Sequence, residues 1–255
     1  MDLYYEIRGS GPALLLVEGL GVATWLWARQ APAFAECFTT ILFDNRGVGR
    51  SAKPPGPYTI GEMAADAAGL LEALDVERAH VLGVSMGGMI AQELALVWPE
   101  RVDRLVLGCT TAGGAMYVPM GPEALRLLLD VGGAPEEVVR RRLPLAFTAE
   151  YLTPERVDRM VAARLEDPQP AYAYQAQAAA GAAFDRSGSV GRIRAPTLVT
   201  AGSADVLVPV ENARRLAERI PGARLKVYEG LGHQFFVEAA DEFNRDAMEF
   251  LEGRG

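Results

Sequence analysis

The stretch HVLGVSMGGMIAQELA, residues 80–95, decides the fold. It begins as an apolar strand, places Ser85 between Gly83 and Gly87, and continues directly as an apolar helix that Pro99 ends. In a G-x-S-x-G turn of this kind, the serine takes a strained backbone conformation that raises its hydroxyl above the sheet. The two glycines let the strand and the helix pack closely. The stretch therefore predicts a nucleophilic serine, against the alternative of an idle serine in a glycine-rich turn.

Short apolar runs alternate with helical patterns on both sides of this turn. Several of the runs are continuous stretches of Val, Leu and Ile, as expected for parallel strands that are buried on both faces. Strands that alternate with helices predict an α/β fold, in which helices cover both faces of a parallel sheet. The predicted strands cover residues 3–9, 13–19, 39–46, 79–85, 104–110, 196–202 and 224–230.

The alternation stops between about Thr111 and Ser189, where helical patterns occur without a convincing strand. At 255 residues the chain is near the upper limit for one hydrophobic core. We therefore predict one α/β core, formed by residues 1–111 and 190–255, that is interrupted by a helical cap over residues 112–189. Because ligands bind at the carboxyl edge of open α/β sheets, we expect the cap to cover that edge.

The formal net charge of −8 argues against nucleic acids and anionic membranes as partners and leaves a small molecule as the expected one. No apolar run approaches the roughly 20 residues that span a bilayer. The first residues do not resemble a signal peptide, so we expect a cytoplasmic protein. Two distant cysteines and two histidines do not suit a zinc site, and we expect no metal, no cofactor and two reduced, buried thiols.

Ser85 needs a general base, and the chain has two histidines. His80 lies five residues earlier on the same strand, roughly 16 Å away at about 3.3 Å per residue, which favours a structural role. His233 follows the last predicted strand, and Asp205 follows the strand over residues 196–202. The order Ser85, Asp205, His233 is the one expected for a catalytic triad with this motif. Taken singly, His233 also suits a solvated loop and Asp205 a turn, so the three assignments depend on one another.

The chain resembles the α/β-hydrolase superfamily over nearly its whole length. FDNRGVGRS, residues 43–51, resembles the D-x-R-G-x-G-x-S turn of that family, and GHQFFVE, residues 232–238, resembles its G-H-x-x-x-x-E segment. Within the superfamily, residues 54–89 and 171–199 are similar to 3-oxoadipate enol-lactonases and related carboxylesterases. The resemblance implies the α/β-hydrolase fold, with a mostly parallel twisted sheet.

The resemblance also implies site residues. The backbone N–H groups of Leu20 and Met86 would form the oxyanion hole, and Asp44 and Arg46 would have architectural roles. Many relatives carry histidine where this chain has Glu18; we expect this glutamate to point away from the pocket and to pair with a donor such as Arg46. Tryptophan occurs only at positions 25, 27 and 98, so the cap lacks the tryptophan that lactonase caps often present.

These features predict a serine hydrolase that cleaves a small, largely uncharged carboxylic ester or lactone through an acyl-enzyme on Ser85. A C–C bond hydrolase or a perhydrolase would use the same triad, and some proteins of this fold are ligand sensors with slow turnover. A dehalogenase or an epoxide hydrolase would need aspartate at position 85. The sequence does not indicate the oligomeric state. Six residues are candidates for the pocket wall: Trp25, Met116, Tyr117, Phe147, Tyr172 and Tyr174.

Overall fold

The apolar runs of the sequence form a seven-stranded sheet in the order β1-β3-β2-β4-β5-β6-β7, as the computed structural model of residues 1–254 describes it. β1 pairs with β3 in the antiparallel sense, and every other neighbouring pair is parallel. All seven predicted strands are present. They are β1 (Tyr5–Arg8), β2 (Ala13–Val17), β3 (Thr39–Phe43), β4 (Ala79–Val84), β5 (Val102–Gly108), β6 (Thr197–Gly202) and β7 (Arg224–Tyr228).

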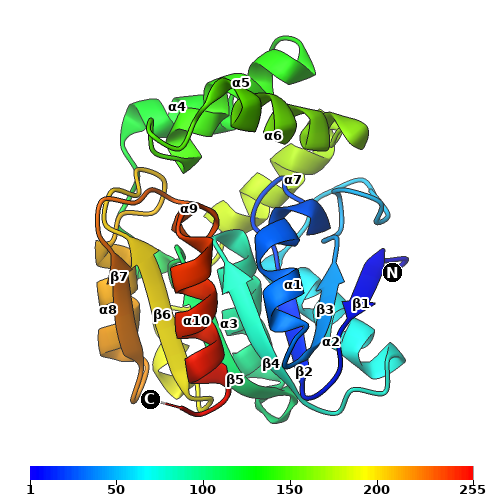
Figure 1. The fold of residues 1–255 in the computed structure, drawn as a ribbon, viewed down its shortest axis with the longest axis vertical. Coiled ribbons are helices and arrows are strands. Elements are labelled where there is room, and N and C mark those ends of the chain that lie inside the picture. The colour runs from blue at the N-terminus through cyan, green and yellow to red at the C-terminus, as the bar shows by residue number, and fades with distance from the viewer. Residues whose placement is uncertain (255) are drawn as a thin grey trace.

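Helices cover both faces of the sheet (Figure 1). One apolar cluster joins the sheet to α2 (Ile60–Ala73), α3 (Met86–Val97) and α8 (Glu211–Arg219), and a second joins it to α1 (Ala31–Phe34) and α10 (Ala240–Leu251). Because both faces are covered, all six residues of β4 and of β6 are buried. The remaining short helices of this core are η1 (Thr24–Arg29), η2 (Pro99–Arg101), η4 (Val190–Arg192) and α9 (Phe235–Glu238).

The chain between β5 and β6 is helical, and most of it forms the upper layer in Figure 1. After η3 (Gly114–Met116) come α4 (Pro122–Leu129), α5 (Pro135–Ala146), α6 (Pro154–Glu166) and α7 (Ala171–Ala182). Proline begins α4, α5 and α6, where its fixed φ suits the first turn and its missing N–H costs no hydrogen bond. We call α4–α7 the cap. No helix of residues 1–254 is long and apolar enough to cross a membrane.

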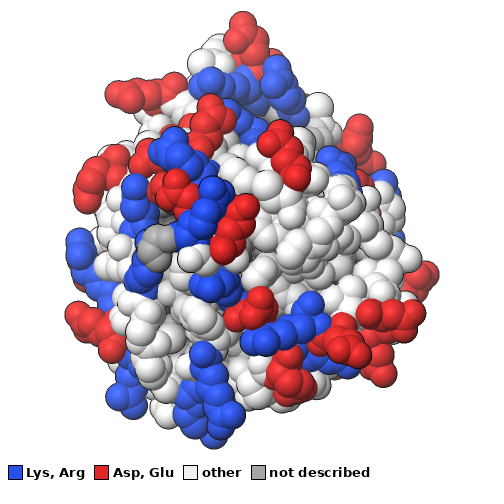
Figure 2. All heavy atoms as spheres, turned by 60° about the horizontal axis from the view of Figure 1, so that its bottom comes forward, with Lys and Arg blue, Asp and Glu red and all other residues white. Residues whose placement is uncertain are grey.

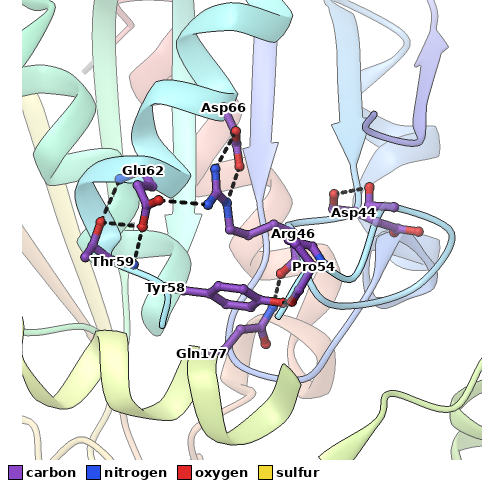
Figure 3. Close-up of polar contacts among 9 residues, drawn as sticks. Asp44, Arg46, Pro54, Tyr58, Thr59, Glu62, Asp66 and Gln177 are labelled. Carbon is purple, nitrogen blue, oxygen red and sulfur yellow. Dashed lines mark hydrogen bonds and ion pairs between the residues drawn. The ribbon is translucent and has the colours of Figure 1, made fainter. Parts of the chain in front are cut away.

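The turn over residues 43–51 is tied to the first turn of α2 (Figure 3). The guanidinium of Arg46 donates to the carboxylate of Asp66 at 2.6 and 2.9 Å and lies 3.3 Å from Glu62. Glu62 also closes a capping box with Thr59. Asp44 is buried and accepts from two backbone N–H groups at 2.7 and 2.8 Å. Asp44 and Arg46 thus fix the backbone of the turn, as expected.

The charged side chains are mixed in sign on the face away from the cap. Figure 2 shows basic and acidic groups side by side around a wide uncharged area. Of the two free cysteines, Cys109 is buried as predicted, whereas Cys37 is exposed. The prediction for Cys37 was wrong because this residue lies in the surface connection between α1 and β3, which the sequence does not distinguish from a strand end.

Candidate active site

Ser85 stands in a strained turn at the carboxyl end of β4, where α3 begins. Its φ of 56° and ψ of −123° lie outside the regions that a side chain normally allows. The strain is held by neighbouring strands: the N–H of Ser85 donates to Gly108 O at 2.8 Å, and the hydroxyl of Thr110 donates to Ser85 O at 2.7 Å. A conformation of this cost persists only where the surrounding structure enforces it, and such residues cluster at functional sites.

The two flanking glycines are needed for this geometry. A Cβ on Gly83 would lie 2.3 Å from Gly87 O, and a Cβ on Gly87 would lie 2.2 Å from Val17 O. Real Cβ atoms do not approach a backbone oxygen so closely, so β2, β4 and α3 could not pack as they do with larger residues. The close packing confirms the structural part of the prediction from the G-x-S-x-G pattern.

His233 and Asp205 meet in the loops that follow β7 and β6. His233 Nδ1 lies 2.7 Å from Asp205 Oδ2, and both side chains are almost fully buried. The other carboxylate oxygen of Asp205 accepts from the N–H groups of Leu207 and Val208, each at 2.8 Å. The carboxylate is therefore fixed by two backbone donors, and its other oxygen can orient the imidazole ring. His80 lies at the start of β4, packed edge-to-face on a phenylalanine ring.

A cavity of about 440 Å³ lies between the cap and the carboxyl edge of the sheet. This volume lies in the range of sites for small ligands. Ser85, His233, Leu20 and Met86 all line the cavity. The backbone N–H groups of Leu20 and Met86 donate to no acceptor within residues 1–254. Residues that carry a hydroxyl, an imidazole and these two unpaired backbone N–H groups thus line one cavity.

Of the six predicted wall residues, Tyr117 and Tyr174 line this cavity, and the other four lie elsewhere. Trp25 borders a separate hollow beside the cap, and Met116 packs on the main apolar cluster. Phe147 stacks on Tyr151 inside the cap, with 5.1 Å between ring centroids, and Tyr172 is exposed and donates to Lys53 O. The apolar or aromatic character of a residue in the sequence did not show whether it lines the cavity or packs elsewhere. The four misplaced residues are Trp25, Met116, Phe147 and Tyr172.

Glu18 points away from this cavity, as expected, but its partner is not Arg46. The side chain is completely buried, and its Oε1 accepts from the indole N–H of Trp27 at 3.0 Å. Its Oε2 is buried without a partner within residues 1–254. Burial raises the pKa of Glu18 well above its ordinary value, and the charge of nearby Asp44 raises it further. The raised pKa favours the neutral form of this side chain, directly after β2.

The raised pKa of Glu18 predicts a pH-dependent loss of stability. Above its ordinary pKa near 4.5 the unfolded chain releases this proton while the folded chain keeps it. The free energy of unfolding should therefore fall as pH rises towards the folded pKa, by up to about 1.4 kcal/mol per pH unit. Glu18→Gln keeps an acceptor for Trp27 and should flatten this decline between pH 5 and 8, measured by urea unfolding.

The matched control is Glu93→Gln, which removes another buried carboxylate that pairs with Arg186. This variant should be less stable than the wild type across the same pH range and should keep the wild-type decline. A Glu18→Gln protein with an unchanged pH slope would contradict a neutral Glu18.

Three polar cap residues that line the cavity were not among the candidates from the sequence: Arg142, Arg164 and Gln177. Gln177 is fully buried and lies against Gly21, in the loop that follows β2. Its Oε1 accepts from Gly21 N at 3.1 Å, and its Nε2 donates to Arg46 O at 2.8 Å; Figure 3 shows the second contact. Polar residues on amphipathic helices are ordinarily solvated, so no signal in the sequence separated these three from their neighbours.

Comparison with known proteins agrees with this geometry. Residues 12–240 match the sequence profile described as the alpha/beta hydrolase fold. A protein named carbamate hydrolase RutD, from Azorhizobium caulinodans, is 36% identical, and the match covers 98% of this chain and 94% of the relative. One named 2-hydroxy-6-oxo-6-phenylhexa-2,4-dienoate hydrolase, from Comamonas testosteroni, is 32% identical over 99% of this chain and 92% of its own. The crystal structure of the enol-lactonase from Burkholderia xenovorans LB400 superimposes with a TM-score of 0.86 at 30% identity, covering 98% of this chain and 96% of that one.

Proposed function

Because the chain belongs to the α/β-hydrolase family and is a hydrolase, we propose that it cleaves a small carboxylic ester or lactone through an acyl-enzyme on Ser85. The strained backbone at Ser85 is the observation that carries the proposal. A non-glycine residue at φ 56° is costly, and here it lines the same cavity as His233, whose Nδ1 lies 2.7 Å from Asp205. A purely structural role for this serine would not require such a strained backbone conformation.

The proposed reaction has two halves. Ser85 Oγ attacks the acyl carbon, while Nε2 of His233 takes the hydroxyl proton. Asp205 holds the proton on Nδ1, which leaves Nε2 as the acceptor and stabilises the imidazolium that forms. The N–H groups of Leu20 and Met86 donate to the oxygen that becomes negative. The imidazolium then gives its proton to the leaving alcohol, and a water activated by the same imidazole cleaves the acyl-enzyme.

A substrate panel tests this proposal. Steady multiple turnover of p-nitrophenyl acetate or butyrate, or of simple lactones, would support it. A single slow burst with a stable adduct would favour a ligand sensor over an enzyme. Because the Comamonas relative is named as a dienoate hydrolase, the panel includes such a dienoate and a test of peracid formation. Faster turnover of either than of every ester and lactone would favour C–C hydrolysis or perhydrolysis.

Gln177 should act as a positioning residue for the loop after β2, which carries Leu20 and Gly21. Gln177→Leu removes the acceptor for Gly21 N and the donor to Arg46 O with little change in volume. We expect kcat for p-nitrophenyl butyrate to fall roughly 10-fold with KM nearly unchanged, because a displaced Leu20 N–H stabilises the transition state less well. Gln175→Leu, on the exposed side of the same helix, is the control. Equal kcat values for the two variants would contradict this role.

A further inference from the structure

Two arginines of the cap line the active-site cavity: Arg142 of α5 and Arg164 of α6. Their hydrogen bonds to the protein go to main-chain carbonyl groups. Arg142 Nη2 donates to Asp130 O at 2.7 Å, and Arg164 Nη1 donates to Gly21 O at 3.1 Å. Each guanidinium keeps further N–H groups that make no hydrogen bond within residues 1–254, and none of those nitrogens is sealed from solvent.

Neither guanidinium forms an ion pair with a carboxylate of residues 1–254. The carboxylate of Asp130, whose carbonyl contacts Arg142, lies 3.2 Å from Arg141 instead. Three other cap arginines pair with carboxylates: Arg126 with Glu123 at 2.7 Å, Arg140 with Glu136 at 2.8 Å, and Arg141 with Asp130 at 3.2 Å. In a chain with 33 acidic and 25 basic residues, these two cations line the active-site cavity without a direct ion pair to any described residue, and Arg164 also borders the separate hollow beside Trp25.

Their surroundings make the missing counter-ion costly. Arg142 lies over the ring of Tyr174 at 4.2 Å from its centroid, and Arg164 lies over Trp25 at 5.1 Å. Burial, together with the neighbouring charge of Arg142, lowers the pKa of Arg164 to about 10, which is still well above neutral pH. Burial also raises the pKa of the Tyr174 hydroxyl, which donates to Leu128 O and so supplies no negative charge. Partly buried cations without a partner favour the entry of an anion.

We propose that the cavity binds substrates that carry a carboxylate, held by Arg142 and Arg164 while the scissile carbonyl lies at Ser85. The proposal rests on the proposed function, and it names the substrate class for the same site. Guanidinium groups hold a carboxylate through paired, charge-assisted hydrogen bonds, which fix its position as well as its charge.

The shape of the cavity defines this class further. Its floor belongs to the core, its arginines belong to the cap, and apolar side chains such as Met89 and Leu145 line the wall. A short apolar chain that joins a carboxylate to the scissile carbonyl fits that order. Half-esters of dicarboxylic acids, and lactones with a carboxylate side chain, have this form. The expectation of an uncharged substrate arose because aromatic and apolar residues were the only wall candidates visible in the sequence.

The test compares two esters of equal acyl chain: p-nitrophenyl hydrogen glutarate, which is an anion, and p-nitrophenyl methyl glutarate, which is neutral. We expect the wild type to prefer the anion in kcat/KM. Arg142→Gln and Arg164→Gln should each lower kcat/KM for the anion roughly 10- to 100-fold, since each removes a hydrogen bond to a charged group. Turnover of the neutral ester should change little. Arg126→Gln removes the same charge from the outer surface of the cap and should leave the preference intact.

Two outcomes would overturn the anion site. Either the wild type shows no preference for the anion, or the Arg142 and Arg164 variants lose activity equally on both esters, as a purely structural role would require. Arg164→Lys, which keeps the charge, guards against a variant that fails to fold. If the wild type hydrolyses neither ester, the proposed function fails, and calorimetric titration with monomethyl glutarate then decides the anion site. Binding that weakens in both glutamine variants supports it, and no binding to the wild type refutes it.

Discussion

Ser85→Ala is expected to lower kcat for p-nitrophenyl butyrate by about 10⁶-fold. The alanine keeps the floor of the cavity and the two backbone donors, but it has no oxygen to form the acyl-enzyme. Substrate binding should change little, so KM should stay within a few-fold of the wild-type value. Any remaining rate would reflect water attack on an ester that the oxyanion donors hold, and it should still exceed the uncatalysed rate. Initial rates at saturating ester measure the effect.

The matched control is Ser187→Ala, which removes an exposed serine hydroxyl that contacts only Asp185. This variant should retain wild-type rates. The alanine at position 85 also releases no backbone strain, since its Cβ meets the same steric limits at φ 56°. Unfolding temperatures close to that of the wild type would show that both variants fold. A Ser85→Ala protein with more than a few per cent of wild-type turnover would contradict a nucleophilic serine.

Asp205→Asn is expected to have the second largest effect, a loss of about 10⁴-fold in kcat. The amide oxygen can keep the two hydrogen bonds from Leu207 and Val208, so the loop should hold its shape. The amide nitrogen then faces His233 Nδ1 and donates to it. That contact selects the tautomer with the proton on Nε2, which cannot accept the proton of Ser85. Initial rates at saturating p-nitrophenyl butyrate measure the loss.

Asp103→Asn serves as the control for this substitution, because Asp103 is an exposed acid beside the other histidine, His80. We expect unchanged kcat for Asp103→Asn. Equal, small losses in the two variants would show that the carboxylate at position 205 only shapes its loop.

The periodic and the motif-bearing parts of this protein could be predicted from its sequence. β4 and β6 are continuous apolar runs because both faces of each strand are buried, and that requirement appears directly in the residue types. The turn at Ser85 was predictable because only glycine tolerates the contacts at positions 83 and 87. The pairing of His233 with Asp205 followed from the order of the chain, since parallel strands bring their carboxyl ends to one edge.

The residues that the sequence missed depend on how elements far apart in the chain are packed. Arg164 contacts Gly21, and Gln177 contacts both Gly21 and Arg46, more than 130 residues away in each case. A single helix pattern gives its apolar stripe but not which of its polar side chains turns towards a distant loop. The partner predicted for Glu18 was wrong for a different reason: Trp27 is only nine residues away, but the short helix η1 that brings its indole to Glu18 has no clear pattern in the sequence.

The central claim is that Ser85 becomes acylated, and labelling with a fluorophosphonate followed by peptide mass spectrometry tests it most directly. We predict one adduct per chain, on the peptide that contains Ser85, with none in Ser85→Ala and much slower labelling in Asp205→Asn. An active wild-type protein that resists the reagent, or that carries the adduct on another residue, would contradict the account.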